Sequence, residues 1–102
     1  MDAQYKQLYR EVQGLRHKVH DLIDDHAHAI ARALKDEVQR LEDEMEVSKK
    51  PRSLEDRIKS IQHHLERAKN DSQASVMDVR HAVMLDDRFD DLRMSLRRLP
   101  NY

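Results

Sequence analysis

The stretch that decides the fold is Val47-Ser48-Lys49-Lys50-Pro51-Arg52-Ser53, because it holds the only proline before residue 100. Proline disfavours helical geometry in the residue that precedes it, so we expect Lys50 to be extended. Ser53 and Asp56 have a spacing that resembles a capping box, which predicts a helix start just after the proline. The sequence therefore predicts a loop at residues 49–53 between two helical halves.

The half before this loop carries one continuous apolar stripe. The stripe consists of Leu8, Val12, Leu15, Val19, Ile23, Ala27, Ile30, Leu34, Val38, Leu41 and Met45. It advances by about 3.7 residues per step, close to the 3.6 residues of an α-helical turn and longer than the 3.5 of a supercoiled heptad repeat. We therefore predict one nearly straight helix over about residues 2–48.

The half after the loop carries two apolar runs, separated by the polar residues 70–75. The first run, in a helix predicted at about residues 54–70, is Leu54, Ile58, Ile61, Leu65 and Ala68. The second, in a helix predicted at about residues 76–99, is Val76, Val79 and Val83, followed by Leu85, Phe89, Leu92, Leu96 and Leu99. Ser75 and Asp78 supply a helix-start signal, and Pro100 ends the pattern. The phase slips near Met84 and Leu85, where we expect a kink or a new helix start.

Two all-α architectures fit this pattern within one domain over residues 1–102. If residues 53–99 form a single helix, the chain is an antiparallel hairpin roughly 70 Å long. If the chain turns at residues 70–75, two shorter helices lie along the first in a three-helix, coiled-coil-like bundle. The polar run and the cap at Ser75 favour the second. Either core is thin, so we expect oligomerisation, most simply a homodimer, to complete the bundle.

Composition excludes several classes of function. The chain has 102 residues, 38% of them charged, no Cys, one Gly and a formal net charge of -1. Without Cys there is no disulfide framework or thiol nucleophile, which fits a cytoplasmic protein. We expect neither a signal peptide nor a membrane span, because no apolar run is long enough. A single Gly cannot build a phosphate-binding loop, and the sequence holds no catalytic motif, so we expect no enzymatic activity and no cofactor.

A basic block at the predicted loop suggests one contact surface. Residues 49–69 hold 7 Lys and Arg against 3 Asp and Glu. The candidate partner-binding residues are Lys49, Lys50, Arg52 and Lys59. They could meet nucleic acid phosphates or an acidic protein surface. No aromatic residue interleaves them, and acidic residues that end the preceding helix explain the same charges by local compensation.

Seven His residues suggest a second kind of site. Candidate metal ligands are His17, Asp21, Asp24 and His28, which would share one face of a continuous helix. The full ligand set of a carboxylate-bridged metal bundle is missing, so a solvated polar face is the simpler interpretation and we expect no metal. His26 lies near the apolar stripe and is the candidate for pH sensitivity.

Three functions remain in order of preference. The first is a non-enzymatic helical scaffold or adaptor that self-associates and mediates protein–protein interaction. The second is a nucleic-acid accessory protein that uses the basic loop. The third is a His/Asp metal-binding helical bundle.

Overall fold

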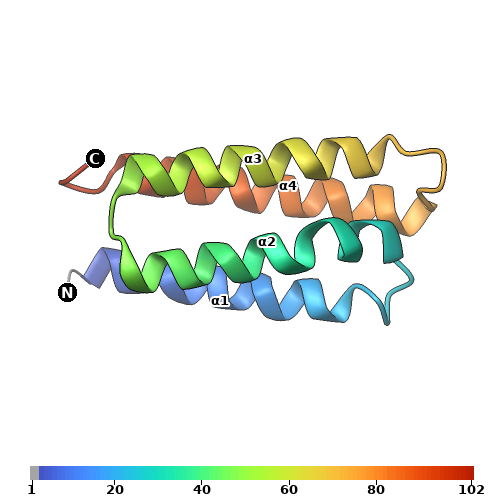
Figure 1. Ribbon diagram of the computed structural model, residues 1–102, viewed down its shortest axis with the longest axis horizontal. Coiled ribbons are helices and arrows are strands. Elements are labelled where there is room, and N and C mark those ends of the chain that lie inside the picture. The colour runs from blue at the N-terminus through green and yellow to red at the C-terminus, as the bar shows by residue number, and fades with distance from the viewer. Residues whose placement is uncertain (1–2) are drawn as a thin grey trace.

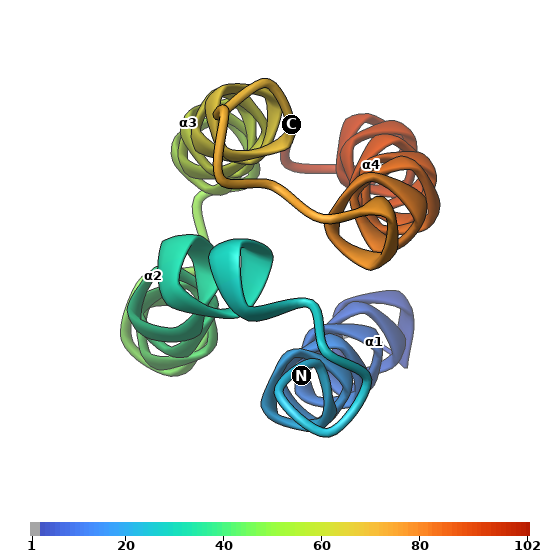
Figure 2. The same cartoon turned by 90° about the vertical axis from the view of Figure 1, so that its right-hand side faces the viewer.

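Figure 1 shows the computed structural model, in which residues 3–102 are described and form four α-helices and no strand. The helices are α1 (Ala3–Asp21), α2 (His28–Val47), α3 (Pro51–Lys69) and α4 (Val76–Arg97). Each runs antiparallel to the one before, and seen end-on they stand at the corners of a square in chain order (Figure 2). The bundle measures 41 × 20 × 18 Å, so the 70 Å hairpin is wrong. The all-α class is confirmed, with one helix more than the three-helix alternative.

The predicted helix over residues 2–48 is wrong in its continuity. Its proposed start at residue 2 lies outside the described residues, and α1 ends at Asp21. His26 takes a left-handed conformation with φ of 62°, the Ala27 N–H donates to Leu22 O at 2.8 Å, and the His26 N–H donates to Ile23 O at 3.1 Å. These bonds are those of a Schellman motif, which ends a helix and reverses the chain.

The break changes which residues face the core. Leu22 is fully buried, whereas Ile23 is 52% exposed and leaves the predicted stripe. The other ten stripe residues are buried as predicted. Residues 22–27 thus form a turn at the point where the stripe advances by four residues twice in succession, from Val19 to Ile23 and from Ile23 to Ala27. Helix α2 therefore folds back along α1 instead of continuing it.

The boundaries of the second half are close to the prediction. The turn at residues 70–75 is confirmed, and so is the capping box of Ser75 with Asp78. Lys50 is extended, with φ of -96° and ψ of 103°. The capping box at Ser53 is wrong, because α3 already begins at Pro51, whose fixed φ suits the first helical position.

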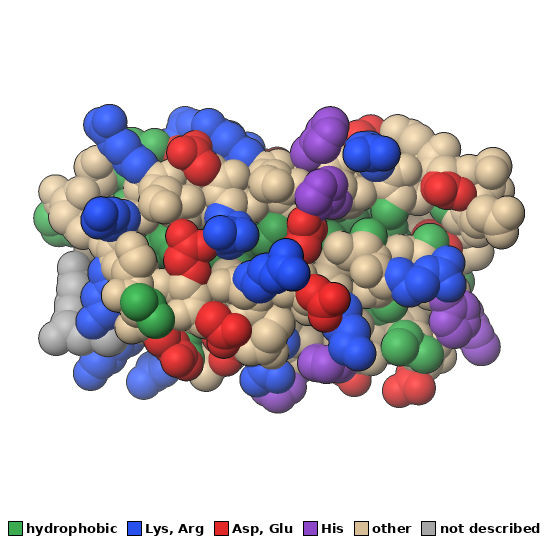
Figure 3. Space-filling view, viewed as in Figure 1, with side chains coloured by type: hydrophobic (Ala, Val, Ile, Leu, Met, Phe, Trp, Pro, Cys, Tyr) green, Lys and Arg blue, Asp and Glu red, His purple; other side chains and the backbone are tan. Residues whose placement is uncertain are grey.

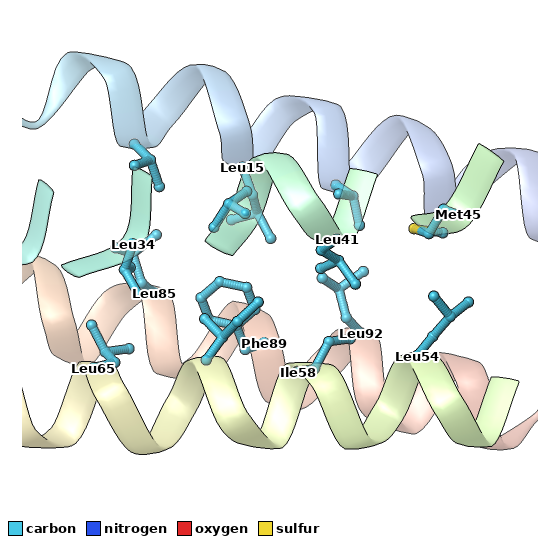
Figure 4. Packing of buried hydrophobic residues seen from close by; sticks show 14 of the residues in the cluster. Leu15, Leu34, Leu41, Met45, Leu54, Ile58, Leu65, Leu85, Phe89 and Leu92 are labelled. Atoms are coloured by element: carbon cyan, nitrogen blue, oxygen red, sulfur yellow. The ribbon is translucent and has the colours of Figure 1, made fainter. Parts of the chain in front are cut away.

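The core is complete within one chain. Its residues come from every described helix and point toward one another along the bundle axis (Figure 4). The largest side chains that are fully buried include Phe89, Leu34, Leu41, Leu54 and Ile58. The prediction of a thin core is therefore wrong, because it assumed two or three helices, whereas four helices enclose this core.

Candidate interaction surface

Helix α4 is apolar on two opposite faces. The inward face is buried and includes Ala82, Leu85, Phe89, Leu92 and Leu96. The outward face carries Val76, Val79, Val83 and Met84, which we call the α4 ridge. Val76 is 77% exposed and Val83 is 52% exposed, so little within residues 3–102 covers them. The predicted apolar run of α4 is therefore divided between two faces. The helix is continuous from Val76 to Arg97, so the new helix start expected near Met84 is wrong.

Asp78 fixes this orientation of α4. Its Oδ1 accepts the N–H of Ile30 at 3.1 Å, and its Oδ2 accepts the N–H of Ser75 at 2.9 Å. Asp78 therefore closes the capping box of α4 and also caps α2, whose own N-cap residue has no capping side chain. Since Asp78 must face α2, the neighbouring Val76 and Val79 are turned toward solvent.

The charge on Asp78 is stabilised where it lies. Burial alone raises the pKa of this carboxyl, but the N–H groups of Ser75, Ile30 and Ala29 outweigh it and hold the pKa below its ordinary value. Asp78 is only 2% exposed, so these main-chain donors replace water as its hydrogen-bond partners. The carboxylate is thus a structural group at the end of the bundle where residues 22–27 and 70–75 meet.

The α4 ridge borders a shallow hollow that continues onto the preceding turn. The hollow has a volume of about 630 Å³, and Ala74, Ser75 and Arg80 line it together with the ridge. Its surface is mainly apolar, and Ser75 and Arg80 are the polar residues that line it. This combination of exposed apolar side chains with one charge at the edge is typical of a protein contact surface.

Several exposed charged residues of α4 have no partner within residues 3–102, and two of them, Arg80 and Asp87, border the α4 ridge. Arg80 and Asp87 are exposed, and neither makes a hydrogen bond or an ion pair within the described chain. Asp86 and Asp90 differ, because their carboxylates accept hydrogen bonds from Gln62 of α3 at 3.0 and 2.8 Å. The charges beside α3 are therefore used in the bundle, whereas those beside the ridge are free.

The predicted basic site is partly used to close the bundle. Lys49 Nζ lies 5.9 Å from the ring centre of Tyr5. The Arg52 guanidinium lies 5.1 Å from the ring centre of Tyr102, and Arg52 Nε donates to the main-chain oxygen of Tyr102 at 2.9 Å. These two candidates hold the loop between α2 and α3 against both ends of the described chain.

The other two basic candidates do not gather into a patch with them. Lys50 is the N-cap residue of α3, and Lys59 lies more than two turns further along that helix. Both are exposed. Figure 3 shows Lys and Arg side chains interspersed with acidic ones across the face that α2 and α3 form. That distribution favours local charge compensation over a phosphate-binding field.

The predicted metal ligands do not share a helix face. His17 and Asp21 lie on α1, Asp24 lies in the following turn, and His28 begins α2. The common face required an unbroken helix, so that prediction is wrong. Among residues 3–102 no group of three or more His, Cys, Asp or Glu side chains is placed to hold a metal ion.

Sequence reasoning missed the His residue that is buried. His26 is exposed, whereas His81 is only 8% exposed and its Nε2 lies 3.5 Å from Oδ2 of Asp25. Spacing along the chain would instead pair Asp25 with His28, and Asp78 with His81, three residues apart on one helix. The fold instead brings Asp25 to His81 across the end of the bundle, which no local spacing could have indicated.

Glu55 is another buried ionisable residue that the sequence analysis did not single out. Its Oε2 accepts Arg97 Nε–H at 2.6 Å, and its Oε1 accepts the hydroxyl of Tyr102. Burial alone raises the pKa of this carboxyl, but the hydrogen bonds from Tyr102 and Arg97 lower it below its ordinary value. The network of hydrogen bonds joins α3 to α4 and to the residues after α4, so its role in this structure is to hold these segments together.

Helices α1 and α4 meet less closely than the other neighbouring helices, which leaves two hollows of about 400 and 420 Å³ between them. Leu8, Leu15 and Leu92 are at their base, but each is at most 3% exposed. The surface of these two hollows is more polar than that of the hollow beside the α4 ridge.

Comparisons with known proteins add no identification. The chain matches no family model, and searches of curated proteins and of solved structures found no significant match. Among the described helices, none has the length and apolar content needed to cross a membrane. Functional inference for this chain therefore rests on its own surface.

Proposed function

We propose that this protein is a non-enzymatic helical adaptor that uses the α4 ridge to bind a protein partner. The observation that carries the proposal is the exposure of Val76, Val79, Val83 and Met84 on a helix whose opposite face already fills the core. Four large apolar side chains exposed together on one face are typical of contact surfaces in proteins that otherwise fold as monomers.

Helix propensity supports this assignment. Valine in a helix is disfavoured relative to alanine by up to about 0.7 kcal/mol, because β-branching restricts its side chain. Inside a core, burial outweighs that cost. Val76, Val79 and Val83 bear it while exposed to solvent, so they stabilise the isolated chain little. Burial against a partner would supply the missing stabilisation.

The buried polar groups also support a structural rather than a catalytic role. Glu42 pairs with Arg16, and Glu55 with Arg97. Asp78 caps two helices. Each of these buried carboxylates joins two helices, and none lines the hollow beside the α4 ridge or the two hollows between α1 and α4. They therefore hold the bundle together, which is the role a rigid adaptor needs.

The two alternatives have less support. A nucleic-acid contact would use Lys49 and Arg52, whose side chains already lie against Tyr5 and Tyr102. A metal site at His17 would need ligands that the turn at residues 22–27 separates. Neither alternative accounts for the exposed valines of α4.

A photo-crosslinking experiment tests the proposal. We would place a benzophenone side chain at Met84, beside the valines, and irradiate the protein in an extract of its source cells. We expect a discrete protein adduct, and we expect V76Q/V79Q/V83Q in the same chain to abolish it. Glutamine removes the apolar surface while favouring the helix slightly more than valine does.

The matched control places the same side chain at Asp36, which is exposed on α2. This position should give no discrete adduct. Equal labelling from Met84 and Asp36, or an adduct that survives the three glutamines, would contradict binding at the ridge. Thermal unfolding followed by circular dichroism would show that every variant is folded.

A further inference from the structure

We propose that the occupant of the α4 ridge is a second copy of this chain, docked with its own α4 antiparallel and with Arg80 facing Asp87 of the other copy. The inference rests on the proposed function and names its partner. What supports it is the placement of Arg80 and Asp87 at equal distances on either side of Val83 and Met84 along the outward face of α4.

The outward face of α4 can pair with the same face of a second copy in one antiparallel register. At about 100° per residue, Val76, Arg80, Val83 and Asp87 follow nearly one line along α4. Arg80 lies three residues before Val83, and Asp87 lies three residues after Met84. A two-fold axis between positions 83 and 84 therefore brings each Arg80 opposite the other copy's Asp87, on both sides of an apolar centre.

The charges select the antiparallel arrangement. In a parallel pair Arg80 would face Arg80 and Asp87 would face Asp87, which places like charges in contact. In the antiparallel pair both contacts are ion pairs, and the helix dipoles oppose each other favourably. An isologous contact of this kind closes after two copies, so it predicts a dimer rather than a fibre.

The two residues that the register pairs are free to make these contacts. Asp86 and Asp90 are engaged by Gln62 of α3. Arg80 and Asp87 have no partner within residues 3–102. The structure therefore leaves one cation and one anion unpaired at the two positions that an antiparallel copy would bring together.

The contact between the two α4 helices is small. A contact of one helix from each copy is smaller than a standard-size interface, which buries about 1,600 Å² in total. The core is already complete without it. We therefore expect a reversible equilibrium between folded monomer and dimer, in contrast to an obligate dimer that holds an incomplete core together.

Charge reversal tests this register, because the pairing of Arg80 with Asp87 of the other copy predicts a specific pattern of loss and rescue. Sedimentation equilibrium of the wild-type chain over increasing concentration should show monomer and dimer. R80D and D87R alone place like charges opposite each other and should each weaken the dimer at least about tenfold. An equimolar mixture of the two should form the heterodimer, because each R80D chain then meets a D87R chain through two restored ion pairs. The double variant R80D/D87R should also recover dimerisation.

Matched controls come from α2. R32D and D36R make the same changes of charge at exposed positions distant from the ridge, and both should dimerise like the wild type. Because the native chain has no Cys, V83C provides a direct probe of the two-fold axis. Under mild oxidation V83C should form a disulfide-linked dimer faster than D36C.

Two results would overturn the proposal. One is a wild-type chain that stays monomeric at every concentration. The other is a dimer that R80D and D87R leave unchanged, or that their mixture does not restore. Failure here is distinguishable from failure of the proposed function. A monomer that still gives a ridge-dependent Met84 adduct with another protein keeps the adaptor role and rejects the self-pairing.

Discussion

Both faces of α4 are rich in apolar residues, but only the inward face is buried. The inward face packs Leu85 and Phe89 into the core, whereas the outward face leaves Val76 and Val83 in water. The polar residue Asp78 decides which face turns inward, because its carboxylate must reach the amide of Ile30. The difference teaches that an apolar face of a helix belongs to the core only when the capping and turn geometry directs it there.

The largest effect should come from a deletion on the inward face. Phe89 is fully buried, so F89A should lower the free energy of unfolding by about 3–5 kcal/mol. Urea unfolding followed by circular dichroism measures it. The control is M94A on the outward face, where a side chain that is 57% exposed should cost less than about 0.5 kcal/mol. Equal losses would break the distinction between the two faces.

Removal of the orienting carboxylate should have the next largest effect. D78A deprives the starts of α2 and α4 of a cap at the same time, and we expect a loss of about 2–3 kcal/mol in the free energy of unfolding. The control D87A removes an exposed carboxylate from the same helix and should change stability little. If D78A were as mild as D87A, Asp78 would not be the residue that orients α4.

Acidic pH should lower the free energy of unfolding through Asp78 of α4 and Glu55 of α3, which is bound to Arg97 of α4. Both have a folded-state pKa below the ordinary values of 3.8 and 4.5. Groups shifted in this direction contribute stability that is present above the unfolded pKa and is lost as pH falls through the folded pKa. The free energy of unfolding should therefore fall from about pH 5 downward. D78N should flatten this dependence, and an unchanged slope would contradict the role of Asp78.

The smallest effect on stability should come from the ridge itself. V76Q/V79Q/V83Q removes exposed apolar surface and improves helix propensity slightly, so the free energy of unfolding should change by no more than about 0.5 kcal/mol. The same variant should abolish the Met84 adduct. A large loss of stability would mean that the valines support the monomer, and the contrast between the faces would disappear.

Local signals in the sequence were enough for much of the fold. Pro51 located the loop between the halves, and the pair of Ser75 and Asp78 located the start of α4. The period of the stripe identified ten of its eleven residues as core. In each case the signal and the structure that it specifies lie within a few residues of each other.

The remaining features depended on contacts that local patterns do not encode. The left-handed residue of the turn before α2 is His26, whereas Gly or Asn would have marked the end of the helix. Asp78 bonds to Ile30, 48 residues away, so its inward direction, and with it the outward direction of the valines, had no local signal. Arg52 meets Tyr102 over a separation of 50 residues, which no charge count could indicate.

The double cap made by Asp78 has a consequence for local opening of the bundle. One carboxylate holds the Ile30 amide in the first half of the chain and the Ser75 amide in the second. If α2 unwinds at its start, Asp78 loses a partner, and the first turn of α4 loosens with it. Hydrogen exchange at these two amides should therefore occur in one shared opening event, so that this end of the bundle behaves as a single cooperative unit.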